Sequence, residues 1–544
     1  MKLRLMLLLP ICLFLCSFLD ERETQTPSIN SYIHEKVDSF YKSSLVLQEE
    51  IQKSKPIDSI RLSYGEVQKK FRTIQFLLEH ISEETVKKYF NGPPLLSLDQ
   101  SIPAVVVLEP KGLQVIDEIL FEDDPDYELL EKQVQDLCRS IQKTMNIFTR
   151  FNLAEADLKM AIYKDLVRIY TLQLTGFDTP GSLKGLENAC FNFLGISSLI
   201  QKFFPDHPQL ATVSAQCIRA ANYLKQNHDF NSFDRVEFYR GFIRPALSEL
   251  AAWKVNELPV LQRNPGQVLA INYQTGELFS EHFFNKAYYA NLPEDLLKSD
   301  KLLALGKKLF YDPILSSDGK MSCATCHKPE LAFTDGLQKS QTNVMGIPGS
   351  RNTPTLWNAI FTKGFFYDLR EEDPSRQIAH VFRDKKEFNT DFIDVIDKLN
   401  AKADYKREFE EIFPVEKVNK NTITSSITAY VASLVDMDSP FDRYMRGASS
   451  EIDPAVIRGF NLFAGKAACA FCHFIPTFSG LVPASYKESE SEVLGVPSVW
   501  IKNGSMELDP DLGRYASGKP RDAADHLRFS FKTSTIRNIE KTTP

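Results

Sequence analysis

The sequence lacks the excess of positive charge that binding to nucleic acid phosphates requires. Its 544 residues include 64 Lys and Arg against 71 Asp and Glu, which gives a formal net charge of −7. This balance argues against nucleic acid as a partner. The composition is 43% hydrophobic and 25% charged, so it also lacks the bias of a disordered or fibrous chain. The length predicts several globular domains.

The chain also lacks an apolar run long enough to span a membrane. Its first residues, MKLRLMLLLPICLFLCSFLD, carry Lys2 and Arg4 before an apolar run that ends at Leu19. That run is short for a membrane span, and the pattern predicts an export leader at residues 1–20, with a buried N-terminal helix as the alternative. A lipid anchor on Cys16, which would associate the protein with a membrane, is a further alternative, although Leu15 fits such a cleavage site poorly.

Cysteines are few and unevenly placed, so the sequence has no disulfide framework. Two of the nine lie in the leader and three are isolated, and isolated cysteines are usually small buried apolar residues. We therefore assign no function to the isolated ones, which are Cys138, Cys190 and Cys217.

The N-terminal half has apolar residues at helical spacing, with charged residues between them, from about residue 25 to 255. NGPP at 91–94, EPKG at 109–112 and FDTPGS at 177–182 break the pattern. We interpret residues 25–255 as a helical bundle. Its clearest apolar stripes are Val67, Phe71, Ile74, Leu78 and Ile81, and Leu130, Val134, Leu137, Ile141, Met145 and Phe148.

Two features of this half and its boundary leave alternatives open. His80 and Glu83 form an HxxE pair that could provide metal ligands on one helical face. Alternatively, His80 could be a solvated or helix-capping histidine that has no connection with Glu83. Residues 256–295 are rich in Pro, Asn and Gly and show no clear period. This segment is predicted to be a linker or a segment that wraps around its neighbours.

The remaining cysteines form two CxxCH motifs, 146 residues apart. In such a motif the two cysteines form thioethers with a haem edge, and the histidine falls under the iron as an axial ligand. A zinc site would need further Cys or His at ligand spacing, and a thioredoxin-like pair would not need the trailing histidine. The motifs predict two covalently bound c-type haems, attached at Cys323, Cys326 and His327 and at Cys469, Cys472 and His473.

The repeat indicates a duplicated one-haem unit in the second half. Helical stretches there are short and loops such as 311–354 and 474–535 are long, so a haem would supply the apolar surface they need. Thioether attachment of haem takes place outside the bacterial inner membrane. Together with the leader, this predicts a periplasmic protein.

Several segments of this half resemble the bacterial dihaem cytochrome c peroxidases, and especially their MauG-like branch. They are LALGKKLFYDPILSSDGKMSCATCHKPELAFTDG, RNTPTLWNA, SPFDRY, GFNLFAGKAACAFCH, DPDLGR and FKTSTIRNIEKTTP, and the resemblance covers about residues 295–544. It implies a mainly α fold in which a helical bundle is followed by two cytochrome c-like haem domains. The first, peroxidatic, would occupy 296–445, and the second, for electron transfer, 446–544.

The resemblance also implies roles for particular residues. Gln377 and Glu387 stand ten residues apart, as the family's distal glutamine and glutamate do, and would serve the first haem. Tyr367 stands where the family commonly has a tryptophan that relays electrons between the haems. No histidine lies between His327 and His380. As in the MauG-like branch, the first haem would therefore have an open face.

A calcium ion between the haems is implied as well, with ligands at Asn352, Thr542 and Pro544. The family continues beyond the final TTP with a motif that supplies the sixth ligand of the second haem. The sequence given is therefore expected to be truncated at its C-terminus, or else the second haem is five-coordinate or takes a ligand such as Met506. In the N-terminal half, FRTIQFLLEHISEETVKKYFNGPPLL resembles the imelysin-type helical domain, a family tied to iron uptake at bacterial surfaces.

The leading hypothesis is an oxidoreductase, a periplasmic dihaem peroxidase that reduces hydrogen peroxide at the first haem. Its electrons would come through the second haem from a small periplasmic donor, a cytochrome c or a cupredoxin. One alternative is a MauG-like oxidase acting on a protein or small-molecule substrate. Another is a non-enzymatic dihaem electron carrier or sensor. Each of these functions is compatible with a homodimer.

Overall fold

The computed structural model describes residues 28–99, 102, 104–255, 268–500 and 506–542. The expected leader at 1–20 lies outside them. Helices dominate this described part of the chain, and its strands form three two-stranded antiparallel sheets. The predicted mainly α fold is confirmed. Within the described ranges, every helix is too short or too polar to cross a membrane.

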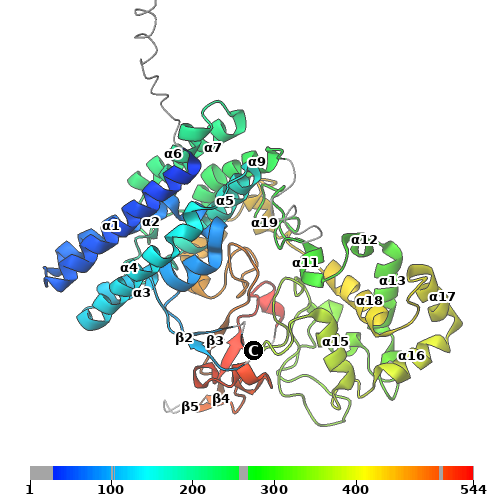
Figure 1. Cartoon of the computed structure of the whole chain (residues 1–544). Coiled ribbons are helices and arrows are strands. Elements are labelled where there is room, and N and C mark those ends of the chain that lie inside the picture. The colour runs from blue at the N-terminus through cyan, green and yellow to red at the C-terminus, as the bar shows by residue number, and fades with distance from the viewer. Residues whose placement is uncertain (1–27, 100–101, 103, 256–267, 501–505, 543–544) are drawn as a thin grey trace, which may run out of the picture.

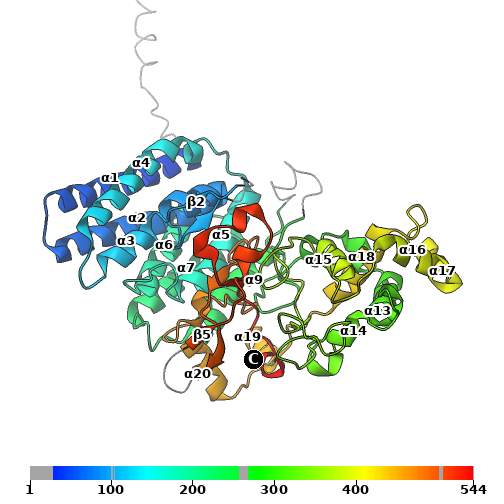
Figure 2. The ribbon, with the colours of Figure 1, turned by 90° about the horizontal axis from the view of Figure 1, so that it is seen from below.

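The N-terminal half forms one lobe of packed helices (Figures 1 and 2). Helix α2 lies at its centre, against α1, α4, α5 and α6, and α7 packs on α6 and α9. The elements of this lobe are α1 (Ile29–Gln52), α2 (Ile57–Thr85), η1 (Val86–Phe90), α3 (Leu113–Leu120), α4 (Tyr127–Thr149), α5 (Glu155–Arg168), η2 (Ile169–Gln173), α6 (Gly185–Phe203), α7 (Pro208–Gln226), α8 (Arg235–Phe238), η3 (Tyr239–Ile243) and α9 (Arg244–Ala252).

Local sequence explains where these helices begin and which face they bury. Ser28 and Asp126 accept hydrogen bonds from the backbone N–H of Ser31 and Leu129, so they cap the N-termini of α1 and α4. The two predicted apolar stripes are the buried faces of α2 and α4, with Ile81 and Met145 partly buried at their margins. The predicted breaks at 91–94, 109–112 and 177–182 all fall between helices.

The second lobe carries the first CxxCH motif and has its own apolar core (Figure 1). Helix α18 packs along α13 and contacts α15, while α16 packs on α17. The helices are α11 (Lys286–Ala290), α12 (Glu294–Leu297), α13 (Asp300–Tyr311), α14 (Cys323–Cys326), α15 (Pro374–Arg383), α16 (Phe392–Asn400), α17 (Ala403–Ile412) and α18 (Lys420–Ser433).

The segment with the second CxxCH motif follows α19 (Pro440–Met445) and α20 (Pro454–Phe463) and is mostly loops. Its strands β3 (Ser491–Val493) and β6 (Ser530–Lys532) pair with each other, as do β4 (Pro497–Trp500) and β5 (Met506–Leu508). Strands β1 (Ser97–Leu98) and β2 (Val107–Leu108) form the third sheet. In both views the C-terminal residues lie between the two lobes (Figures 1 and 2).

The N-terminal bundle and the second motif segment share one continuous core. The core that contains the bundle's helices also includes Ala470, Ile475, Leu481 and Tyr486. Polar contacts join the same parts, since the backbone N–H of Arg235 donates to the side chain of Asn461 at 2.8 Å. The bundle therefore packs directly against the segment that carries the second CxxCH motif, although the two are far apart in the sequence.

The described part of the predicted linker, residues 268–290, is a wrapping segment. It buries Ile271, Leu278, Phe279 and Phe283 in the shared core. The Phe279 ring is fully buried and contacts aromatic rings from both sides. They are Tyr170 and Tyr239 of the bundle, and Phe441 and Phe460 of α19 and α20.

Replacing Phe279 with alanine is expected to lower the free energy of unfolding by roughly 3–5 kcal/mol, since a buried aromatic leaves a cavity that its rigid neighbours cannot close. Urea unfolding followed by circular dichroism measures the change. As a control, Tyr127→Ala removes a ring that is 46% exposed and should change stability by about 0.5 kcal/mol or less. Equal effects of the two substitutions would contradict the role of Phe279 as a central packing residue.

Candidate active site

Each CxxCH motif lies in a short helical turn, which is α-helical at Cys323–Cys326 and a 3₁₀ turn at Cys469–Phe471. In each, the backbone N–H of the histidine donates to the carbonyl of the first cysteine, at 2.9 Å for His327 to Cys323 and 3.0 Å for His473 to Cys469. One helical turn therefore holds both cysteines and the histidine together. This contact spans only four residues, so the motif's own sequence is enough to form it.

Each histidine ring is oriented by a backbone carbonyl a few residues further on. The Nδ1 atom of His327 lies 2.9 Å from the Phe333 carbonyl oxygen, and Nδ1 of His473 lies 3.3 Å from that of Phe478. A carbonyl can only accept, so Nδ1 carries the proton and Nε2 keeps the lone pair that binds a metal. Both phenylalanines adopt left-handed backbone angles, with φ of 60° and 51°. Burial lowers the pKa of both histidines, which favours the neutral ligand form.

The first motif lies in the wall of a cavity of about 400 Å³. The structure brings the expected residues of the first site together around it. Cys323, Cys326, His327, Asn352, Tyr367, Gln377, Glu387 and Thr542 all line this cavity.

Gln377 reaches the cavity from α15, a helix capped by Asp373, whose carboxylate accepts from the N–H groups of Ser375 and Arg376. Glu387 follows in the turn after this helix, where its N–H donates to the Asp384 carbonyl at 3.1 Å. The pKa of Glu387 is raised to about 7, chiefly by burial and also by the nearby Asp384 carboxylate, with Arg370 opposing both. This carboxyl group can therefore hold or release a proton near neutral pH.

Tyr367 and Asn352 are neighbours in the cavity wall. Burial raises the pKa of Tyr367, and a hydrogen bond with the Asn352 side chain opposes the rise. The Tyr367 carbonyl accepts from the N–H of Lys532 at 2.6 Å, which ties it to strand β6. Pro544, the third expected calcium ligand, lies outside the described residues. Within the described ranges no three His, Cys, Asp or Glu side chains are grouped to hold a metal ion.

One side of the cavity carries a cationic cluster that the sequence analysis did not find. Arg351 and Arg370 each pair with Asp368 at 2.7 Å. Burial lowers the pKa of Lys532 to about 8, and Asp368 opposes this shift. Lys532 comes from a segment far along the chain from the other three residues, and no local motif marks the cluster.

The cavity fits a haem group on several observations. It contains both cysteines of the motif, and His327 presents an unprotonated Nε2. The Nε atom of Arg370 is buried with no hydrogen-bond partner, and buried unpaired donors are costly. The carboxylate groups of a haem would satisfy Arg370 and Lys532, so these two residues would hold them, while Arg351 is already paired with Asp368 and Asp511.

The second motif is more open, and the N-terminal bundle contacts it directly. Cys469 is exposed, while Cys472 and His473 are half-buried. The ring of Phe177 packs edge-on against Phe471 at 6.2 Å and Phe474 at 5.4 Å.

Phe177 belongs to the predicted FDTPGS break, and its neighbour Asp178 anchors that turn. The Asp178 carboxylate forms buried ion pairs with Arg72 of α2, at 2.7 Å, and with Arg168 of α5. The turn that contacts the second motif is therefore held firmly to the centre of the bundle.

The two sites also share a loop. Thr477, Ser479 and Leu481, which directly follow the second motif, line the cavity of the first. The loop includes Phe478, whose carbonyl orients His473. A short stretch of backbone thus connects the His473 ring to the wall of the first cavity.

Two other sequence features are not placed as ligands. His80 is bonded through Nε2 to Asp157 at 2.9 Å, and Glu83 pairs with Lys164 at 2.9 Å. The HxxE pair is therefore engaged within the bundle, and its histidine is neither solvated nor a helix cap. Met345, in the loop after the first motif, is a second residue whose type could ligate a haem iron, but its side chain is 98% exposed.

Comparison with known proteins agrees with this site. A family model for di-haem cytochrome c peroxidase matches residues 300–450. The chain is 34% identical to the cytochrome-c peroxidase IdrP1 of Pseudomonas sp. (strain SCT), over 46% of this chain and 69% of the relative. It is 32% identical to the methylamine utilization protein MauG of Methylorubrum extorquens, over 44% of this chain and 63% of the relative.

A solved structure of a MauG-like protein associated with microbial copper homeostasis is 27% identical, with a TM-score of 0.40, over 46% of this chain and 73% of that one. The protein belongs to the di-haem cytochrome c peroxidase family, which implies two haem groups. The chain spans about two thirds of the length of the curated relatives it matches.

Proposed function

We propose that the protein is a peroxidase that reduces hydrogen peroxide to water at the first site, with electrons delivered through the second. The observation that carries this proposal is the position of Glu387. Its carboxyl group has a pKa near 7 and lines the same cavity as His327 and Gln377. When bound there, a haem supplies an iron centre that accepts peroxide and exchanges electrons.

The protein's own residues would manage the protons of this reaction. The Glu387 carboxylate accepts the proton of one peroxide oxygen and returns it to the other as that oxygen leaves as water. The Gln377 side-chain amide orients the peroxide by hydrogen bonding. In all, one peroxide, two protons and two electrons give two waters.

Electron delivery is proposed to run through the shared loop and Tyr367. The loop 477–481 joins the second motif to the first cavity, and Tyr367 lies in the cavity wall with its carbonyl bonded to Lys532. The donor would be a small cytochrome c or cupredoxin. We also propose a periplasmic location, supported by the leader pattern and by thioether haem attachment. A calcium ion at Asn352 and Thr542, a lipid anchor and a homodimer stay predictions, as does the imelysin-like role of the bundle.

A MauG-like oxidase is the second candidate, and one observation favours it. Among the described residues that line the cavity, His327 is the only histidine. No second imidazole among these residues would compete for the iron, which supports a first site that reacts with peroxide without prior reduction. The same reaction with peroxide would then draw its electrons from a protein or organic substrate.

The proposal predicts a characteristic pH dependence of peroxide consumption. The haem-loaded protein is mixed with hydrogen peroxide and a reduced small c-type cytochrome across the range around pH 7. Because Glu387 acts as a base only when ionised, the rate should rise with pH through about 7. Peroxide consumption that leaves the cytochrome reduced and oxidises an added protein or organic substrate instead would favour the MauG-like alternative. Absence of any reaction with peroxide would contradict both enzymes and support the electron carrier or sensor.

A further inference from the structure

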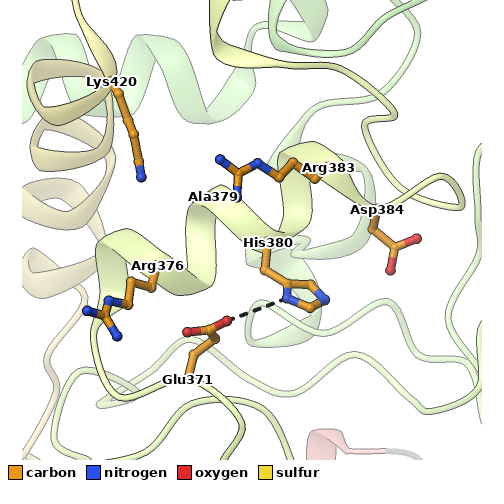
Figure 3. A pocket seen from close by; sticks show the side chains of 7 residues that line it. All are labelled: Glu371, Arg376, Ala379, His380, Arg383, Asp384 and Lys420. Atoms are coloured by element: carbon orange, nitrogen blue, oxygen red, sulfur yellow. Dashed lines mark ion pairs between the residues drawn. The ribbon is translucent and has the colours of Figure 1, made fainter. Parts of the chain in front are cut away.

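A second cavity, of about 510 Å³, lies on the outer face of α15, in the first-site lobe (Figure 3). Arg376, His380 and Arg383 of this helix line it, together with Lys420 of α18. In the figure, the side chains of Lys420 and Arg383 point towards the same space. Gln377 and Val381, on the other side of α15, face the haem cavity, and Asp384 lines both cavities.

Three of these cations have no anionic partner. Among the described residues, no carboxylate forms an ion pair with Arg376, Arg383 or Lys420. The two acidic residues of the cavity are already engaged. Glu371 pairs with His380 at 3.6 Å, and an Asp384 carboxylate oxygen accepts from the N–H of Lys386 at 2.8 Å. Both carboxylates keep their negative charge, so the two arginines and the lysine leave the cavity with one positive charge in excess, in a chain of net charge −7.

Two of the cations stand where a helix disfavours them. Arg376 is the third residue of α15 and Lys420 is the first residue of α18. The N-terminus of a helix carries the positive end of the macrodipole, so acidic rather than basic residues stabilise the first turn. The first N–H groups of both helices are already capped, by Asp373 and Asn419. An anion in the cavity would therefore be bound by side chains rather than by the helix N–H groups. The N-termini of α15 and α18 would make the electrostatic potential in the cavity more positive.

We propose that this cavity is a binding site for a small dianion of the carboxylate or phosphate class. Guanidinium groups bind such oxyanions through paired hydrogen bonds, and Arg376 and Arg383 supply two of them from one helix face. Lys420 adds a third positive charge from the neighbouring helix. The volume lies in the range of small-molecule sites.

The test is calorimetric titration of the full-length, haem-loaded protein with two probes, inorganic phosphate and succinate, at low ionic strength. Saturable binding of at least one probe is expected. The double variant Arg376→Gln/Arg383→Gln should bind it at least about tenfold more weakly, because both bidentate partners are lost. As a matched control, Lys402→Gln/Arg407→Gln removes two exposed cations of the same lobe that do not line the cavity, and it should bind like the wild type.

A second measurement locates the site. Phenylglyoxal modifies accessible arginines, and the bound probe should protect Arg376 and Arg383, as read by peptide mass spectrometry, while Arg407 stays reactive. The proposal is overturned if neither probe binds saturably, if the double variant binds like the wild type, or if no protection is seen. Neither experiment uses peroxide, so the outcome is independent of the proposed peroxidase activity.

Discussion

Replacing Glu387 with glutamine is expected to slow the reaction of the haem-loaded protein with hydrogen peroxide by roughly 10²–10⁴-fold, the usual contribution of a general acid–base. Glutamine keeps the size and polarity of the side chain but cannot accept and return a proton at pH 7. Stopped-flow absorbance of the oxidised protein after mixing with peroxide measures the rate. The variant should also lose the rise in rate through about pH 7, because the group responsible for it is gone.

A matched control is Glu416→Gln, which alters an exposed glutamate of the same lobe and should leave the rate unchanged. The haem content and absorption spectrum of the oxidised variant should match those of the wild type, because Glu387 does not belong to either attachment motif. If Glu387→Gln reacts as fast as the wild type, with the same pH profile, the proton role assigned to Glu387 is wrong.

Loss of either cysteine pair is expected to halve the covalently bound haem, since each motif attaches one group. Cys323→Ala/Cys326→Ala should also lose the reaction with peroxide, because these residues lie in the cavity of Gln377 and Glu387. Cys469→Ala/Cys472→Ala should keep the initial reaction with peroxide and lose turnover with an electron donor. The first-site lobe has its own core, so its helices are expected to fold without the second haem.

Haem per protein is measured from the absorbance of the pyridine complex and from the mass of the intact chain. Cys190→Ala serves as the control, since Cys190 is buried and isolated, and its haem content should be that of the wild type. Full haem content in either double variant would contradict the assignment of that motif. Loss of the initial peroxide reaction in Cys469→Ala/Cys472→Ala would show that the second haem is needed at the first site itself.

The sequence was sufficient for features that depend on neighbouring residues. The apolar stripes of α2 and α4 follow from the helical period, and both are buried as expected. The attachment motifs also form locally, because the hydrogen bond from His327 to Cys323 closes within one turn. Gln377 and Glu387 are different, since their spacing alone suggests only a solvated helix. The family resemblance singled them out, and the structure brings both to the wall of one cavity.

Only the tertiary structure decided which distant segments meet. Lys532 lies with Arg351 and Arg370 around Asp368. Phe177 of the bundle packs on the second motif, and residues 477–481 line the first cavity. Such contacts link positions more than a hundred residues apart, and no periodicity or spacing encodes them. The sequence by itself predicted two haems, and it predicted which cysteines and histidines would hold them. Packing determined the charge around the first site and the bundle's place against the second, because burial and pairing of charges exist only once the lobes are assembled.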